Sequence, residues 1–282
     1  MIATLFLYQE HNFYGKGIFM NDIDKINSSV IILDIRNFTP LMKKYSMNSD
    51  FLNMIKNIYE YGLQVTSAFC KADDFYINSK GDGFLCIIFG ENHYVKAYLI
   101  GLLLLKHARK YFNDFFLDKK DSGLYPSEGR DFFGIGLESG NVEKIETQVI
   151  NGKKVETYLG NVINIAARIE ALSKEHGRTT MLFGPVINDL LAKNLFGFPY
   201  NELISKAKDF SPTELLDIEE QMTDINYKLL SSYIFEHMLK GVDKPLPIFR
   251  ISPTQFKNMN TNEWEFLTKI PSDIKTVFES FF

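Results

Sequence analysis

The chain has 282 residues, of which 45% are hydrophobic and 23% charged, a composition typical of a folded globular protein and not of a disordered one. Its formal net charge of −4 argues against the basic surface that proteins binding nucleic acid or anionic membranes carry. The two cysteines, Cys70 and Cys86, stand in apolar surroundings, which predicts reduced, buried thiols and a cytoplasmic protein.

The first third of the chain predicts an extension, a strand and a long helix. Residues 1–27 lack the pattern of a signal peptide and are expected to form a short extension. The β-branched run over 28–35 predicts a strand. After it, Thr39 is expected to cap a helix whose first residue is the following proline. This helix should reach Phe69, with a break near 46–50.

The middle of the chain predicts a hairpin followed by a core helix. Apolar runs over 73–80 and 83–89 predict two strands joined by a Gly-Asp-Gly turn. A helix is expected over 93–116. Its apolar run over 97–105 is far shorter than the ~20 residues that cross a bilayer, so it indicates a buried helix and no membrane partner.

The second half of the chain predicts shorter elements. They are, in order, a strand over 131–140, a hairpin over 142–159, a helix over 160–177, a strand over 178–184 and a helix from Pro185. Residues 196–232 have weak periodicity and read as an inserted subregion. Strand character returns over 234–252, and the tail over 253–282 is expected to end in a docked helix.

The first elements follow the order β-α-β-β-α-β, which predicts an α+β fold of the ferredoxin-like type. In this topology the end of the first strand lies beside the hairpin turn, so Asp34 and Asp82 are expected to meet. Two carboxylates at one sheet end suit a hard divalent cation. Taken singly, Asp34 is better explained as a helix cap and Asp82 as a turn residue; together, on this topology, they favour the metal site.

Four separated motifs resemble the class III nucleotide cyclase domain, the catalytic domain of adenylate and guanylate cyclases. They are "VIILDIRNFTPLM", "KGDGFLCIIFG", "FFGIGLESGNV" and "YLGNVINIAARIEAL", in this order and spacing. The resemblance covers about residues 28–251 and implies a cyclase domain over 28–252. It also implies a βαββαβ core with an added hairpin and C-terminal strands, working as a head-to-tail homodimer.

The resemblance also implies roles for individual residues. Asp34, Ile35 and Asp82 match the ligands of two Mg²⁺ or Mn²⁺ ions per site. Asn164 matches the asparagine that orients the ribose, and Arg168 matches the arginine that stabilises the transition state. Both are also explained without catalysis, Asn164 as a helix-turn cap and Arg168 as a surface ion-pair partner.

Two further basic residues match phosphate-binding positions of the family. Arg178 corresponds to a phosphate-binding arginine and Lys240 to the triphosphate lysine, although both are equally explained as solvated loop charges. The implied reaction is attack of a ribose 3′-hydroxyl on the α-phosphate of the same NTP, which releases pyrophosphate and forms a 3′,5′-cyclic nucleotide. In the family, metal ligands and arginine come from opposite protomers.

The positions that read the base depart from the family pattern. Asn78 stands where adenylate cyclases have Lys and guanylate cyclases have Glu, and Thr157 stands at the partner position, as in bacterial adenylate cyclases. A carboxamide can both donate to and accept from a pyrimidine edge, although Asn78 is also explained as a polar strand end. Lys80 replaces a residue that is usually neutral, which favours the carbonyl-rich uracil.

A cyclase domain with short extensions and altered base-reading residues resembles the bacterial Pycsar pyrimidine cyclases. That resemblance implies a UTP or CTP substrate, a cyclic UMP or cyclic CMP messenger in anti-phage defence, and a separate effector protein. One alternative is an adenylate cyclase that uses ATP. Another is a non-catalytic cyclase-like dimerisation module, which the presence of both aspartates, the asparagine and the arginine disfavours.

Overall fold

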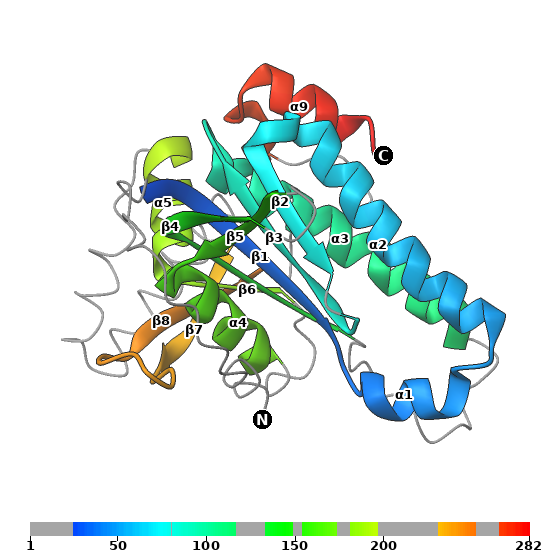
Figure 1. Cartoon of the computed structure of the whole chain (residues 1–282). Coiled ribbons are helices and arrows are strands. Elements are labelled where there is room, and N and C mark those ends of the chain that lie inside the picture. Colours follow the sequence, from blue (N-terminus) through cyan, green and yellow to red (C-terminus); the bar gives the residue numbers. More distant parts are fainter. Residues whose placement is uncertain are drawn as a thin grey trace, which may run out of the picture.

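The computed structural model describes residues 25–79, 81–116, 133–148, 154–173, 181–196, 231–251 and 265–282. Their strands form one mixed sheet in the order β2-β3-β1-β4-β6-β8-β7, with β5 paired to β4 (Figure 1). Residues 1–24 and most of the predicted insertion over 196–232 lie outside the described residues. The proposed limits of the extension, domain and tail therefore stay predictions.

The strands are β1 (Lys25–Ile35), β2 (Phe75–Ser79), β3 (Gly83–Phe89), β4 (Phe133–Gln148), β5 (Lys154–Leu159), β6 (Met181–Phe183), β7 (Ser231–His237) and β8 (Leu246–Ile251). The α-helices are α1 (Phe38–Tyr45), α2 (Ser49–Phe69), α3 (His93–Phe116), α4 (Asn161–Ser173), α5 (Pro185–Leu191) and α9 (Ser272–Glu279). Short 3₁₀ or π turns cover Ala72–Asp74, Ala192–Phe196 and Glu265–Thr268.

The predicted ferredoxin-like core is confirmed. Strand β1 lies in the middle, antiparallel to both β3 and β4. Strand β4 is longer than the sequence predicted, because one continuous strand pairs with β1 over Phe133–Glu143 and then with β5 over Glu143–Gln148. The parallel pairing of β4 with β6 extends the sheet toward the β7–β8 hairpin.

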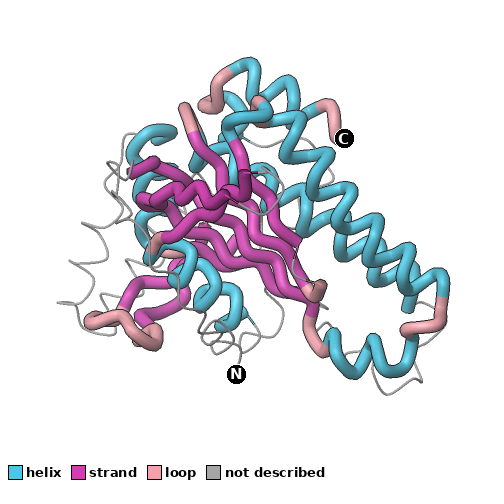
Figure 2. Tube along the Cα trace, viewed as in Figure 1, coloured by secondary structure: helices cyan, strands magenta, loops and turns pink. Residues whose placement is uncertain are grey.

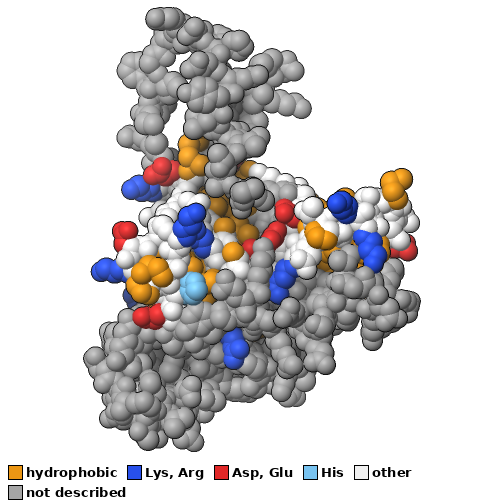
Figure 3. Space-filling model, turned by 90° about the horizontal axis from the view of Figure 1, so that it is seen from below, with side chains coloured by type: hydrophobic (Ala, Val, Ile, Leu, Met, Phe, Trp, Pro, Cys, Tyr) orange, Lys and Arg blue, Asp and Glu red, His pale blue; other side chains and the backbone are white. Residues whose placement is uncertain are grey.

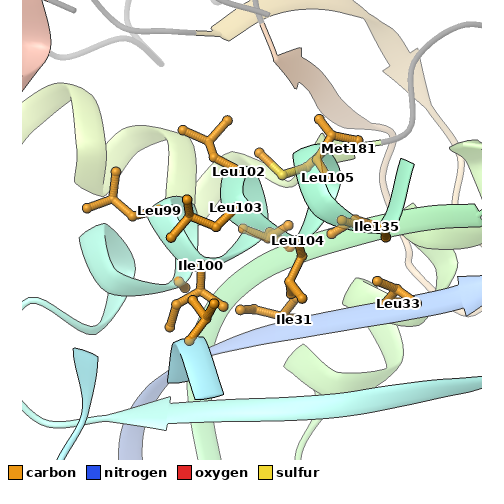
Figure 4. Packing of buried hydrophobic residues seen from close by; sticks show 14 of the residues in the cluster. Ile31, Leu33, Leu99, Ile100, Leu102, Leu103, Leu104, Leu105, Ile135 and Met181 are labelled. Carbon is orange, nitrogen blue, oxygen red and sulfur yellow. The ribbon is translucent and has the colours of Figure 1, made fainter. Parts of the chain in front are cut away.

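Helices α2 and α3 cover one face of the sheet, and α4 covers the other (Figures 1 and 2). Successive side chains of β1 point to opposite faces of the sheet, so this strand contributes to both apolar layers. Ile31, Leu33 and Ile35 pack under α2 and α3, whereas Val30 and Ile32 pack toward α4. Figure 4 shows the apolar run of α3 lying against β1 and β4. Burial of this run contributes hydrophobic driving force for packing α3 on the sheet.

No described helix combines the length and apolar character needed to cross a bilayer.

Both cysteines are free and buried, as predicted. Burial raises the pKa of the Cys70 thiol to about 11, so this thiol stays protonated at neutral pH.

The start of the first helix differs from the prediction. Asn37, with φ of 54° and no side-chain capping bond, precedes the helix, so Thr39 lies in the first turn and is not the cap. Asparagine tolerates this left-handed conformation, which lets the chain turn sharply out of β1. The predicted break in the helix is confirmed: α1 ends at Tyr45, and the Asn48 side chain accepts a 2.9 Å bond from the Phe51 amide at the start of α2.

Glycines on β4 let α4 approach the sheet closely. A β-carbon at Gly136 would collide with the Ala166 carbonyl oxygen and the Glu170 amide of α4.

At the C-terminus, Ile274 and Phe278 of α9 are buried, and this helix lies beside α2 in Figure 1. The predicted docked helix in the tail is therefore confirmed.

Candidate active site

The end of β1 and the Gly-Asp-Gly turn meet, as the sequence predicted. Asp34 stands opposite Gly83 of β3 on one side and Gly134 of β4 on the other. The Ile35 amide donates a 2.7 Å hydrogen bond to the Asp82 carbonyl oxygen. A β-carbon at Gly83 would collide with the Leu33 carbonyl oxygen, so this close approach of the two strands requires glycine.

Tyr59 of α2 joins this pair of acids, and the sequence analysis did not identify it. Its hydroxyl donates a 2.7 Å hydrogen bond to the Gly81 carbonyl oxygen. Burial raises the pKa of Tyr59 to about 12, and the negative charges of Asp82 and Asp34 add to this rise. Both carboxylates therefore lie within electrostatic reach of one hydroxyl group, although Asp34 is on β1 and Asp82 is in the turn between β2 and β3.

The donor atoms at this corner fit a hard divalent cation. Two carboxylates and nearby backbone carbonyl groups are oxygen ligands, which Mg²⁺ and Mn²⁺ prefer. Over the described ranges, no group of three or more His, Cys, Asp or Glu side chains gathers to hold a metal. A site with two carboxylates suits ions that take their remaining oxygens from water and substrate phosphates.

The predicted catalytic residues Asn164 and Arg168 lie one turn apart on α4. Six residues of this helix are buried on the side that faces the sheet: Val162, Ala166, Ile169, Glu170, Leu172 and Ser173. At 3.6 residues per turn, Asn164 and Arg168 fall on the opposite side of the helix, with Asn164 exposed and Arg168 partly exposed. They therefore face away from the sheet whose end carries Asp34.

The turn between β7 and β8 lies beside Arg168. A guanidinium nitrogen of Arg168 is 3.8 Å from the position that a β-carbon on Gly241 would take. Lys240 precedes Gly241 in this turn and is exposed. The structure thus places the predicted transition-state residue Arg168 beside the turn that carries Lys240, while Arg178 and Lys80 lie outside the described residues.

Asn78 is exposed on β2, and an aromatic cluster connects it to β5. Its amide nitrogen donates a 3.1 Å hydrogen bond to the Tyr76 hydroxyl. The ring of Tyr76 lies 4.9 Å from the ring of Tyr158, which lies 5.0 Å from the ring of Phe89. Because successive side chains of a strand point to opposite faces, Thr157 lies on the face of β5 away from Tyr158. The connection between β2 and β5 thus runs through the tyrosines and not through Thr157.

The lower face of the molecule carries charge of both signs. Figure 3 shows acidic and basic side chains interspersed with apolar atoms over the described part of this face. A mixed surface of this kind does not produce a long-range field of one sign.

No protein-family model matches this chain, and no curated protein matches its sequence. Among solved structures, it resembles the adenylyl cyclase CyaB from P. aeruginosa, with a TM-score of 0.53 and 13% identity over 82% of this chain and 96% of that one. It also resembles the guanylate cyclase domain of RhGC from Catenaria anguillulae, solved in complex with GTP, with a TM-score of 0.52 and 14% identity over 80% and 96%.

A third solved structure is the catalytic core of a rhodopsin-guanylyl cyclase with converted specificity, in complex with ATPαS. Its TM-score is 0.52 and its identity 15%, over 83% of this chain and all of that one. All three of these structures are adenylyl or guanylyl cyclases or their catalytic domains. The chain therefore has the α+β fold of the class III adenylyl and guanylyl cyclase domains.

Proposed function

We propose that this protein is a nucleotide cyclase that converts an NTP to a 3′,5′-cyclic nucleotide and pyrophosphate. The observation that carries the proposal is the meeting of Asp34 with the turn of Asp82 at one corner of a cyclase-type sheet. These are the positions at which the cyclase motifs have their metal ligands. Fold similarity alone would not support catalysis, because one fold hosts many functions.

The residues of this corner would hold the metal ions. The carboxylates of Asp34 and Asp82 and the Ile35 carbonyl would hold Mg²⁺ or Mn²⁺, two ions per site. When bound, such ions supply the positive charge that lowers the pKa of the attacking 3′-hydroxyl and neutralises the phosphates.

The basic residues and the asparagine act on the nucleotide itself. Asn164 orients the ribose so that its 3′-hydroxyl lies in line with the α-phosphate. Arg168 stabilises the negative charge that spreads over the α-phosphoryl oxygens, and Lys240 and Arg178 hold the triphosphate. The proximity of Arg168 to the turn that carries Lys240 supports a shared phosphate site for these two residues.

The separation of Asp34 from Asn164 and Arg168 supports a homodimer with shared sites. Asp34 lies on the sheet, on the same face as Ile32, whereas Arg168 projects from the far side of the helix that covers this face. A second copy, packed head to tail, would bring its own Asn164 and Arg168 to the first copy's aspartates. Such a dimer would contain two composite sites.

The base-reading residues favour a pyrimidine nucleotide, with UTP ahead of CTP. The Asn78 carboxamide can donate and accept, and it offers neither the cation of adenine-reading sites nor the carboxylate of guanine-reading sites. The product would then be a second messenger in phage defence that acts on a separate effector protein. A second candidate is ATP cyclisation to cAMP, which Thr157 favours because bacterial adenylate cyclases also use threonine at this position.

The experiment that tests this function is incubation of the purified protein with Mn²⁺ and each of the four NTPs, with the cyclic product identified by mass. We expect cyclic UMP or cyclic CMP from the wild type and none from Asp34→Ala or Asp82→Ala. Cyclic AMP as the main product would support the second candidate. Stoichiometric binding of metal and nucleotide without turnover would instead support a non-catalytic dimerisation module.

A further inference from the structure

We infer that Tyr59 is a positioning residue for the metal-binding turn, and that its hydroxyl holds Asp82 in place relative to Asp34. This inference rests on the proposed function, because it assumes that these two aspartates bind metal. Tyr59 belongs to α2, which lies outside all four of the cyclase motifs.

Two elements hold the backbone of the turn at consecutive carbonyl groups. The Tyr59 hydroxyl donates to the Gly81 carbonyl oxygen at 2.7 Å, and the Ile35 amide donates to the Asp82 carbonyl oxygen at 2.7 Å. One bond comes from helix α2 and the other from the end of β1. Together they fix the peptide units on both sides of the Asp82 side chain.

Packing does not confine the tip of the turn. Gly81 has φ of +81°, a left-handed conformation, and a β-carbon built on it would have no atom within 4 Å. An open glycine turn can sample several backbone conformations, so its geometry depends on the hydrogen bonds that it makes. The bond from Tyr59 is therefore the contact that the helical layer provides to this turn.

Tyr59 also contacts the residue that follows the turn. Its ring meets the ring of Phe84 edge-on, with centroids 6.4 Å apart and planes at 75°. Phe84 is buried in the core beneath α2, where a β-carbon at Gly62 would lie 3.2 Å from its ring. Tyr59 thus contacts the chain on both sides of Asp82, and the packed core fixes its own position.

The consequence concerns metal affinity more than folding. A metal site needs its ligands held close to their productive geometry, and small displacements of one ligand weaken binding. Without the hydroxyl, the Gly81 carbonyl would bond to water, and Asp82 would spend less time in the position that matches Asp34. A lost neutral hydrogen bond of this kind corresponds to about a 3- to 10-fold weaker site.

The test compares Tyr59→Phe with the matched variant Tyr61→Phe on the same helix. Both changes remove one hydroxyl and keep the ring. The Tyr61 hydroxyl is buried and has no hydrogen-bond partner among the described residues, and its ring stacks on His107 at 4.0 Å, away from the turn. Mn²⁺ binding in the absence of nucleotide is measured by electron paramagnetic resonance, and backbone protection at Ile35 by amide hydrogen exchange.

We expect Tyr59→Phe to raise the Kd for Mn²⁺, and the Mn²⁺ concentration for half-maximal turnover, about 3- to 10-fold. The Ile35 amide should exchange faster, while the melting temperature stays close to that of Tyr61→Phe. Equal Mn²⁺ affinity in the two variants, with a wild type that binds the ion, would overturn the inference. So would a lower melting temperature in Tyr59→Phe with unchanged Mn²⁺ affinity, since this indicates a structural role only. A wild type that neither binds Mn²⁺ nor turns over any NTP would refute the proposed function, and the inference with it.

Discussion

The Arg36 guanidinium donates hydrogen bonds to the Ser173 carbonyl oxygen at 2.5 Å and to the Ser173 hydroxyl at 3.1 Å. Arg36 follows the acid-bearing end of β1, and Ser173 is the last residue of α4. The last carbonyl groups of a helix have no partner within the helix, and a cation there also complements the helix dipole. The contact therefore joins the corner that carries Asp34 to the helix that carries Arg168.

Arg36→Gln should destabilise the protein by about 2 kcal/mol, because it removes a charged donor from a partly buried helix end. The measurement is the free energy of unfolding in urea. The matched control is Lys56→Gln on α2, whose ion pair with Glu60 is 65% and 62% exposed and should contribute about 0.5 kcal/mol or less. Equal effects of the two variants would show that the Arg36–Ser173 contact does not hold the helix end.

Mixing Asp34→Ala protein with Arg168→Ala protein should restore activity, if each site takes residues from two copies. Random exchange of subunits makes about half of the dimers hybrid, each with one intact site, so about one quarter of wild-type turnover is expected. Product formation is measured by mass after subunit exchange, with each variant alone as the control. An inactive mixture, in which mass spectrometry of the intact dimers shows exchange, would contradict the shared sites.

Asn78→Lys should shift the preferred substrate toward ATP by about 10-fold, because it replaces a carboxamide with the cation of adenine-reading sites. The readout is the ratio of cyclic products formed from an equal mixture of the four NTPs. An unchanged ratio would remove Asn78 from base recognition.

Tyr76→Phe should weaken the discrimination between the NTPs while leaving total turnover similar, because the Asn78 amide loses the hydroxyl that orients it. The matched control is Tyr158→Phe in the same aromatic cluster, since the Tyr158 hydroxyl donates to Glu156 at 3.4 Å and not to Asn78. The same product ratio in both variants would show that the Tyr76 hydroxyl does not set the specificity.

Two buried groups should make stability depend on pH in opposite directions. Burial raises the pKa of Glu138 from about 4.5 to about 7, against the stabilising backbone donors of Ser139, Ile187 and Val186. Burial lowers the pKa of His93 from about 6.5 to about 4. They belong to one network: the Ser29 hydroxyl bonds to His93 at 2.7 Å and to the Ser139 hydroxyl at 2.6 Å, and the Ser139 amide donates to Glu138 at 2.8 Å.

Between pH 4.5 and 6.5 the folded state binds more protons at Glu138 than the unfolded state, so acidification stabilises it through this group. At His93 the unfolded state binds more protons, so acidification destabilises the protein. Glu138→Gln removes only the first effect. Its free energy of unfolding should therefore fall by about 2 kcal/mol more than that of the wild type between pH 6.5 and 4.5. Parallel urea-unfolding curves across this range would contradict the assignment.

The sequence by itself determined the order of the elements and the position of the acids. The alternation of Ser28–Ile35 specifies a strand with two apolar faces, the run over 97–105 specifies a buried helix, and the Gly-Asp-Gly turn specifies a hairpin. These features depend on the local period of apolar residues and on glycine conformations, which neighbouring residues determine. The topology that follows from this order was enough to bring Asp34 and Asp82 together.

Only the tertiary structure decided which side chains support that corner. No local sequence pattern links Tyr59 to Gly81 or Arg36 to Ser173, because each pair is far apart in the chain. The face of β5 that holds Tyr158 likewise depends on how β5 pairs with β4. The start of α1 at Phe38 likewise depends on how the chain leaves β1 through Asn37, not on the capping preference of Thr39. Each of these contacts joins residues whose distance is set by the packing of whole layers, so no short stretch of sequence encodes it.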